Sequence, residues 1–212
     1  ESMLILTSFA SEWYRQQLFD TDEGKRIGLS YFKERGFTEN IIRKYDLGYS
    51  PAKRDAFTNA ALKKGFKIDF LTETGLTIVK EDRKFDRFAE RVLFPIHSLS
   101  GQVIAFGGRI MRKDTKMAKY LNSPESEIYH KRRVLYGIYQ ARKEITKQNQ
   151  CILVEGYTDV ISLSQSGVEN VVASSGTSLT PDQVKQIKRF TPNLVILYDG
   201  DPAGIKASMR GI

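Results

Sequence analysis

The chain has 212 residues, 41% of them hydrophobic and 11% aromatic, a size and composition that suit one large or two small soluble domains. It carries 33 Lys and Arg against 25 Asp and Glu, has no apolar run long enough to cross a bilayer, and does not start like a signal peptide. Its single cysteine, Cys151, excludes an internal disulfide and argues against a thiolate zinc site, so we expect a cytoplasmic protein without a membrane partner.

The first third of the chain is predicted to be mostly helical. Apolar residues recur at helical spacing over residues 3–19, and a second amphipathic stretch over residues 22–35 stops at Gly36. Thr38 is placed to cap a short third helix, and residues 55–64 form another helix that ends at glycine.

Strand patterns follow. Residues 76–79, 91–96 and 102–106 are rich in β-branched and aromatic side chains, and a turn between the last two predicts an antiparallel hairpin. We expect residues 111–130 to be an irregular connection and residues 133–147 to be an amphipathic helix.

From Cys151 onward strands and helices alternate. The expected order is strand 152–154, helix 158–165, strand 170–173, helix 181–190, strand 194–197 and a helix from Pro202. Such alternation predicts a parallel sheet, with the carboxyl ends of its strands at one edge. The fold class is therefore an α+β part, residues 1–150, followed by an α/β part with a parallel sheet, residues 151–212.

Positive charge is concentrated in the first part. Residues 1–150 hold 28 Lys and Arg against 19 Asp and Glu, whereas residues 151–212 hold 5 against 6. Between residues 109 and 143 there are ten basic and three acidic side chains, interleaved with four tyrosines. This pattern favours a polyanion as partner, although a solvated surface is the commoner explanation of a charge run.

Four acidic residues follow two of the predicted parallel strands. Glu155 comes directly after the strand 152–154, Asp159 lies in the first turn of the next helix, and Asp199 and Asp201 follow the strand 194–197. Ligands of parallel sheets collect beyond the carboxyl ends of strands, so these side chains are expected to converge. Because like charges repel, the cluster predicts a divalent cation such as Mg²⁺, which prefers carboxylate oxygens.

Each acid also has a plain structural explanation when it is taken alone. Asp201 can cap a helix, Asp159 can complement a helix dipole, and Asp199 followed by glycine can form a turn. Their joint placement at two strand ends favours the metal site, and Glu155 has no capping role.

The two acidic motifs resemble those of the Toprim domain, which primases, topoisomerases and related nucleases share. The motifs are Glu155-Gly-Tyr-Thr-Asp159 and Tyr198-Asp-Gly-Asp-Pro-Ala-Gly204. Upstream, residues 90–96, 106–109 and 119–124, together with residues 31–37, are similar to stretches of the bacterial DnaG-type primase. Topoisomerases lack this upstream series, so the resemblance favours the central RNA polymerase domain of a primase.

The resemblance implies RNA primer synthesis on single-stranded DNA during replication, with nucleoside triphosphates as substrates. It gives Glu155 an acid/base part or a place close to the metal, and it makes Asp159, Asp199 and Asp201 ligands of Mg²⁺ or Mn²⁺. Five residues would bind the nucleotide or the template: Arg35, Arg109, Lys119, Tyr120 and Asn122. Two alternatives stay open, a Toprim-type nucleic-acid-binding module without turnover and a nuclease or topoisomerase fragment.

The same resemblance predicts that this sequence is a central piece of a longer primase. The family's zinc domain and its region that binds the replicative helicase would lie outside it, so no zinc is expected here. The sequence also ends before the family's third acidic motif. We therefore expect an incomplete metal site and weak or absent primer synthesis by this chain alone.

Overall fold

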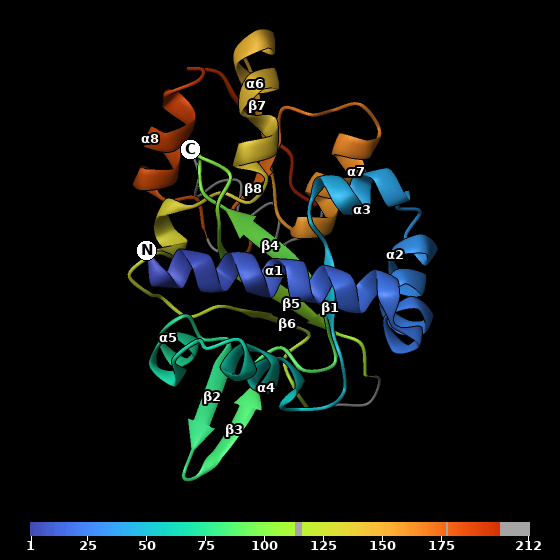
Figure 1. Cartoon of the computed structure of the whole chain (residues 1–212). Helices are drawn as coiled ribbons and strands as arrows, with labels where there is room; N and C mark the ends of the chain where they lie inside the picture. The colour runs from blue at the N-terminus through green and yellow to red at the C-terminus, as the bar shows by residue number, and fades with distance from the viewer. Residues whose placement is uncertain (113–115, 177, 200–212) are drawn as a thin grey trace. The chain divides into compact units, whose positions relative to one another are not determined.

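The computed structural model describes residues 1–112, 116–176 and 178–199 (Figure 1). Backbone contacts divide these residues into two compact units. The first unit comprises residues 1–96 and 102–129, and the second comprises residues 97–101 and the described residues from 130 onward. In the described ranges no helix is both long and apolar enough to span a membrane.

Helices make up most of the first half of the first unit. They are α1 (Ser2–Asp20), the π-helical turn η1 (Gly24–Leu29), α2 (Ser30–Glu34), α3 (Glu39–Lys44), α4 (Ala56–Lys63) and α5 (Ile68–Glu73). Two of the predicted helix ends are confirmed, the start of α3 and the end of α4. The side chain of Thr38 accepts a hydrogen bond from the N–H of Ile41, and Gly65 adopts a φ of +94° just after α4. The helix α5 was not predicted.

Six strands form two sheets in the first unit. They are β1 (Gly48–Ser50), β2 (Thr77–Lys80), β3 (Arg83–Asp86), β4 (Arg91–His97), β5 (Val103–Ile110) and β6 (Tyr120–Asn122). The larger sheet has the order β1-β4-β5-β6, in which β1 pairs antiparallel with β4 and β5 pairs antiparallel with β6. In a separate ribbon beside α4 and α5, β2 pairs antiparallel with β3 (Figure 1). The hairpin predicted around residue 100 is confirmed, since β4 and β5 are neighbours.

The irregular connection expected over residues 111–130 is wrong at one point. Residues 120–122 form the strand β6, which pairs with the end of β5. The strands β1 and β3 were missed as well. These segments are short and mostly polar or glycine-containing, so their extended form depends on a partner strand distant in sequence and not on a local pattern.

The core of the first unit lies between α1 and the larger sheet, with α4 and α5 adding to it. Its buried residues include Leu6, Ala10, Tyr14, Phe57, Leu71, Phe88, Leu93 and Phe106. Every residue of β4 is buried, as expected for a central strand. This packing holds in place the sheet that carries the basic side chains described below.

The second unit contains the predicted parallel sheet. Its elements are η2 (Lys131–Arg133), α6 (Ile138–Gln148), β7 (Cys151–Val154), α7 (Tyr157–Gln165), β8 (Val171–Ala173), α8 (Pro181–Lys188) and β9 (Leu194–Ile196). The strand order is β8-β7-β9, and both pairings are parallel. Thr180 and Gln183 form a capping box at the start of α8. The predicted fold class is confirmed, and the helix expected from Pro202 lies outside the described residues.

One boundary in the second unit differs from the prediction. The helix expected over residues 133–147 begins only at Ile138, because Gly137 adopts a φ of +81° and interrupts the pattern. Residues 131–133 form a 3-10 turn instead. Leu135 is nevertheless buried against the apolar face of α6, with Cys151 and Leu153 of β7. The division into domains at residue 150 stays a proposal.

Candidate functional site

Three of the four predicted acidic residues line one pocket of the second unit. Glu155 follows β7 and Asp199 follows β9, and these strands are parallel neighbours, so their carboxyl ends meet. Together with Asp159 of α7, both residues line a pocket of about 350 Å³. A long hydrogen bond of 3.4 Å joins the backbone N–H of Asp199 to Oε1 of Glu155. Asp201 lies outside the described residues.

The carboxylate of Asp159 also has a local role. Its Oδ2 accepts a hydrogen bond of 3.0 Å from the backbone N–H of Gly156, directly before α7. An acidic side chain in the first turn of a helix satisfies a free N–H and complements the positive end of the helix dipole. The structural explanation of Asp159 therefore holds.

The described side chains of the acidic pocket are of the type that binds a hard cation, but they do not lie close enough together to hold one. Its charged donors are carboxylates, and hard divalent cations prefer oxygen ligands. Burial and the charge of Glu155 raise the pKa of Tyr198 in the same pocket, while a hydrogen bond with Ser174 lowers it. Among residues 1–112, 116–176 and 178–199, no three acidic, histidine or cysteine side chains are grouped closely enough to hold a metal ion.

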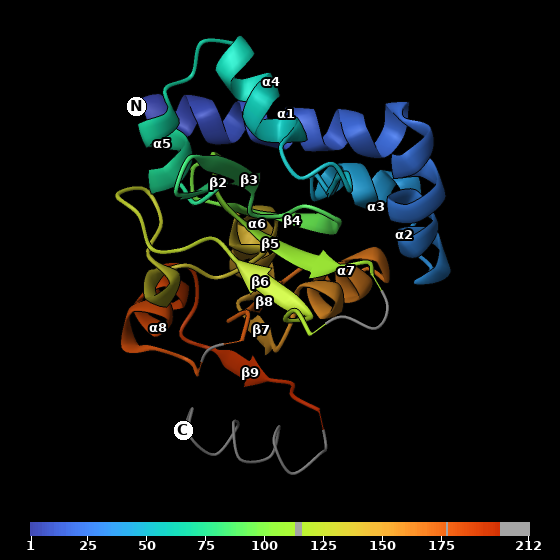
Figure 2. The same cartoon turned by 90° about the horizontal axis from the view of Figure 1, so that it is seen from below.

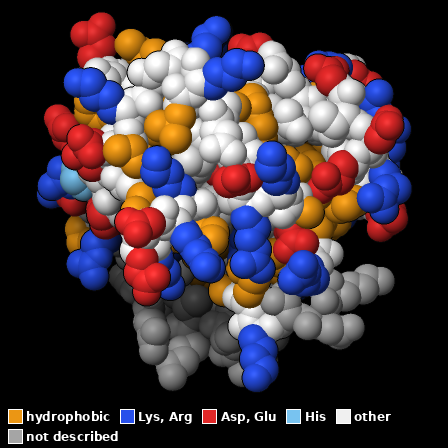
Figure 3. Space-filling view, turned by 60° about the horizontal axis from the view of Figure 1, so that its bottom comes forward, with side chains coloured by type: hydrophobic (Ala, Val, Ile, Leu, Met, Phe, Trp, Pro, Cys, Tyr) orange, Lys and Arg blue, Asp and Glu red, His pale blue; other side chains and the backbone are white. Residues whose placement is uncertain are grey.

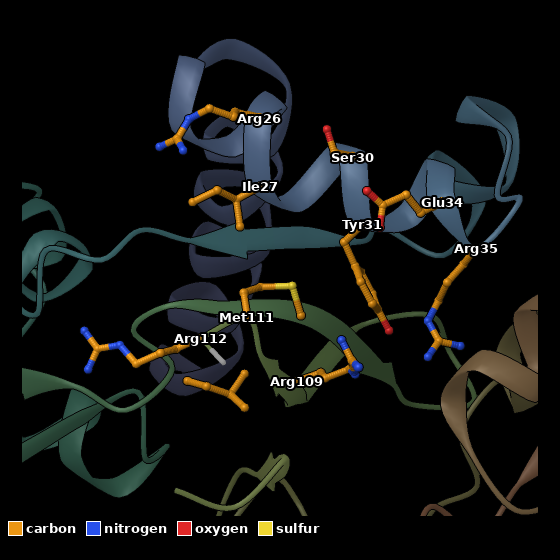
Figure 4. Close-up of a pocket in the computed structure, with 10 residues that line it drawn as sticks. Arg26, Ile27, Ser30, Tyr31, Glu34, Arg35, Arg109, Met111 and Arg112 are labelled. Atoms are coloured by element: carbon orange, nitrogen blue, oxygen red, sulfur yellow. The ribbon is translucent and has the colours of Figure 1, made fainter. Parts of the chain in front are cut away.

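A second pocket, in the first unit, collects basic and aromatic side chains. It has a volume of about 510 Å³ and lies between η1 with α2 on one side and the end of β5 on the other (Figure 4). Its charged and aromatic lining residues are Arg26, Tyr31, Glu34, Arg35, Arg109 and Arg112. We call this the arginine pocket.

Tyr31 is the centre of the arginine pocket. The guanidinium carbon of Arg35 lies 5.1 Å from the centroid of the Tyr31 ring, and that of Arg109 lies 4.5 Å from it. Figure 4 shows both guanidinium groups beside this ring. Tyr31 and Arg35 share a helix face because they are four residues apart, whereas Arg109 arrives from β5. Cation–π contacts of this kind fix the direction of an arginine that has no carboxylate partner.

Tyr120 does not line the arginine pocket but lies beside it, across the sheet from Arg109. Arg109 and Tyr120 are directly opposite residues of β5 and β6, so their side chains leave the same face of the sheet. The pKa of Tyr31 is raised, first by burial and then by the nearby Tyr120, while the positive charges of Arg109 and Arg35 lower it. The structure thus brings Arg35, Arg109 and Tyr120 together.

The other two predicted binding residues lie on either side of the first residues of β6. Lys119 directly precedes β6 and Asn122 is its last residue, and neither lines the arginine pocket. The side chain of Lys119 is exposed, and its carbonyl accepts a hydrogen bond from the N–H of Ile110. Asn122 pairs with Gly107 across the sheet. Their roles in binding stay predictions.

The arginine pocket carries an excess of positive charge, because four arginines and one acid, Glu34, line it. Only Arg112 forms an ion pair, with Glu90 at 2.9 Å, and the three remaining arginines pair with no acidic side chain in the described part of the chain. The buried Nε of Arg109 also lacks a hydrogen-bond partner among those residues. On the face of the molecule in Figure 3, basic and acidic side chains are mixed.

Sequence reasoning missed several residues of this pocket. Tyr31, Arg26 and Ser30 were not proposed as site residues, although the stretch 31–37 was recognised as similar to primases. The spacing of Tyr31 and Arg35 was a usable signal, because it is typical of neighbours on one helix face. Nothing local in the sequence indicated that this helix lies against the end of β5.

Comparisons with known proteins agree with this arrangement. Residues 13–142 match the family described as DNA primase catalytic core, N-terminal domain, and residues 152–212 match the Toprim-like family. The DNA primase of Halalkalibacterium halodurans is 42% identical over 212 residues, which cover 99% of this chain and 35% of that protein. The DNA primase of Pseudomonas aeruginosa is 37% identical over 209 residues, covering 98% and 31%.

A solved structure extends the similarity to the whole fold. The RNA polymerase domain of the Mycobacterium tuberculosis primase DnaG superposes with a TM-score of 0.92 at 35% identity, covering 98% of this chain and 69% of that one. The chain spans about a third of the length of the curated relatives it matches. Since the primase match covers more than half of the chain, and the Toprim-like match follows it, this chain belongs to the family of DnaG-type DNA primase catalytic cores.

Proposed function

We propose that this chain is the part of a DNA primase that holds a single-stranded DNA template and joins nucleoside triphosphates into a short RNA primer. The observation that carries the proposal is the arginine pocket, in which Arg35 and Arg109 flank Tyr31 with Tyr120 alongside. A similar structure, 36% identical, is described as a DnaG primase catalytic domain bound to single-stranded DNA. This supports the same kind of ligand here.

The chemistry of the arginine pocket suits a single strand. A guanidinium group can grip a phosphate through two parallel hydrogen bonds, and an aromatic ring offers a face on which a base stacks. Arg109 and Arg35 have no acidic partner in the described residues, so a phosphate does not have to displace one. Tyr120 is exposed, with 39% of its surface accessible, and we propose that a base of the strand stacks on its ring.

We further propose that Glu155, Asp159, Asp199 and Asp201 hold Mg²⁺ or Mn²⁺ at the edge of the parallel sheet. Such an ion polarises the triphosphate and lowers the pKa of the attacking hydroxyl. Glu155 takes the acid/base part or supports the ion, and Asp159 is oriented by its hydrogen bond to the N–H of Gly156. A bound ion would draw on carboxylate oxygens that now accept backbone hydrogen bonds.

One observation favours a second function, a nucleic-acid-binding module without turnover. In the described ranges the acidic side chains are not grouped closely enough to hold a metal ion, while the arginine pocket is already formed. Binding of a single strand without metal-dependent synthesis would fit this arrangement. A primer-synthesis assay with Mn²⁺ on a single-stranded template separates the two functions.

The arginine pocket is tested by measuring the affinity for a labelled single-stranded oligonucleotide at several salt concentrations. Arg109→Ala is expected to weaken binding and to flatten the slope of log affinity against log salt by about 0.7, the contribution of one neutralised phosphate. Arg83→Ala is the matched control, because Arg83 is an exposed arginine of β3 in the same unit and outside the pocket. Equal affinities and slopes for the two variants would contradict the proposal.

A further inference from the structure

Two arginines beneath β6 hold the segment that carries three of the predicted binding residues. Arg91 of β4 is 1% exposed, and its guanidinium group donates to three carbonyl oxygens. Nη1 reaches the carbonyls of Gly108 at 3.1 Å and Lys119 at 3.3 Å, and Nη2 reaches the carbonyl of Ala118 at 3.0 Å. Arg87, directly after β3, donates from Nε and Nη2 to the carbonyl of Asn122, both at 3.2 Å.

The side chain of Arg91 passes across β5 at a residue that has no side chain. The sheet order places β5 between β4 and β6, as Figure 2 shows, so the side chain of Arg91 has to cross β5 to reach residues 118 and 119. It crosses at Gly108, where an added Cβ would lie 3.0 Å from Cδ of Arg91 and 2.7 Å from Cδ1 of Phe88. The absence of a side chain at Gly108 therefore makes room for Arg91 and Phe88.

Neither arginine has the partner that a buried structural arginine normally has. Within the described residues, Arg87 and Arg91 form no ion pair with Asp or Glu, and their hydrogen-bond acceptors are all backbone carbonyls. Burial lowers the pKa of both guanidinium groups, and for Arg91 the charge of Arg87 adds to this effect. Burying cations without a counter-ion costs free energy, so a role beyond packing is indicated.

We propose that Arg87 and Arg91 are positioning residues, which hold the backbone of residues 118–122 so that Tyr120 stays opposite Arg109 and Lys119 and Asn122 are presented to the template. This inference rests on the proposed function. The strand β6 has only three residues and lies at the edge of its sheet, so pairing with β5 is a weak restraint by itself. Hydrogen bonds to its carbonyls from the opposite side of β5 restrain it further.

Arg87 is the better residue to change, because it is only partly buried and its variants are expected to fold. Arg87→Met and Arg87→Gln lose the same charge and have similar length, but only glutamine can still donate a hydrogen bond to the carbonyl of Asn122. A positioning role predicts near-parental affinity for single-stranded DNA in Arg87→Gln and a loss of about five- to tenfold in Arg87→Met, the effect of one hydrogen bond. Should Arg87→Met not fold, Arg87→Ala takes its place.

A spectroscopic signal and a double variant complete the test. The fluorine resonance of 3-fluorotyrosine at position 120 is expected to shift in Arg87→Met and to stay in place in the control Arg83→Met. If Arg87 acts through Tyr120, Arg87→Met combined with Tyr120→Leu binds no more weakly than Tyr120→Leu alone. Equal affinities of Arg87→Gln and Arg87→Met would overturn the inference, and losses that multiply in the double variant would overturn the part of it that concerns Tyr120.

The outcomes also separate this inference from the proposed function. If Arg109→Ala and Tyr120→Leu bind single-stranded DNA like the parent, the proposed function fails, and the positioning role fails with it. If these two variants weaken binding and Arg87→Met does not, the proposed function stands and only the positioning role is lost.

Discussion

Asp86, the last residue of β3, caps the helix α4, which begins thirty residues before it in the chain. Its Oδ2 accepts a hydrogen bond of 2.8 Å from the N–H of Phe57, and its Oδ1 accepts one of 2.9 Å from the N–H of Thr58. The hydroxyl of Thr58 donates to the same Oδ1 at 2.6 Å. Asp55, the N-cap residue by position, makes no such bond.

This relationship predicts a large difference between two aspartates. Asp86→Ala leaves two backbone N–H groups at the start of α4 without their acceptor, so the free energy of unfolding should fall by about 2–4 kcal/mol. Asp55→Ala removes the same charge one position before the helix and should change it by less than about 0.5 kcal/mol. Urea unfolding of both variants measures the difference, and similar losses would show that Asp86 is not the cap.

The same relationship shows where sequence reasoning ends. The pattern of residues 55–64 predicted the helix and its stop at Gly65 correctly, because both depend on local signals. The acceptor at its start comes from β3, which pairs with β2, and no local pattern indicates it. The missed strand β6 is a similar case, since its extended form depends on β5.

In the candidate site too, the residues that follow local patterns were predicted, and those brought together by distant contacts were not. The three acids Glu155, Asp159 and Asp199 were found from sequence because Glu155 and Asp199 follow strong strand patterns and Asp159 lies in the first turn of the next helix, and parallel pairing places the strand ends together. The arginine pocket needed the structure, because Tyr31 and Arg109 are far apart in sequence and meet only when a helix lies against the end of β5. The family resemblance supplied Arg35 and Arg109 without their common partner.

Tyr31 is predicted to organise the arginine pocket through its ring and not through its hydroxyl. Tyr31→Leu removes the face that Arg35 and Arg109 contact, at about 0.5–1 kcal/mol for each cation–π interaction. The affinity for single-stranded DNA should fall about fivefold to tenfold, because the guanidinium groups lose their fixed direction. Tyr31→Phe keeps the ring and is expected to bind like the parent. Anisotropy titrations of both variants provide the comparison, and loss in Tyr31→Phe would point to the hydroxyl instead.

Binding of a divalent ion is predicted to depend on the acidic residues at the edge of the parallel sheet. Mn²⁺ titration followed by electron paramagnetic resonance should show weaker binding, by about tenfold or more, in Asp199→Asn, because an amide oxygen carries no charge to offset that of the ion. Asp182→Asn is the control, since Asp182 is an acid of the same unit that pairs with Arg133 and Lys185 on and beside α8. Equal Mn²⁺ affinities of the two variants would contradict the metal site.

The last prediction concerns Cys151, the chain's only cysteine, which is buried in β7. Burial raises the pKa of its thiol to about 12, so the folded protein keeps the thiol neutral where an unfolded chain releases the proton above about pH 8.5. The folded state then binds more protons than the unfolded state, and the free energy of unfolding should fall as the pH rises from about 9 towards 12.

Labelling with a thiol reagent provides the measurement. At pH 8 Cys151 should react slowly in the native protein and rapidly in urea, and Cys151→Ser should show a smaller loss of stability between pH 9 and 11 than the parent. Because the chain has a single thiol, the labelling signal comes from this position alone. Rapid reaction of the native protein at pH 8 would mean that β7 opens readily, and the edge that carries Glu155 could not then be a rigid platform for a metal site.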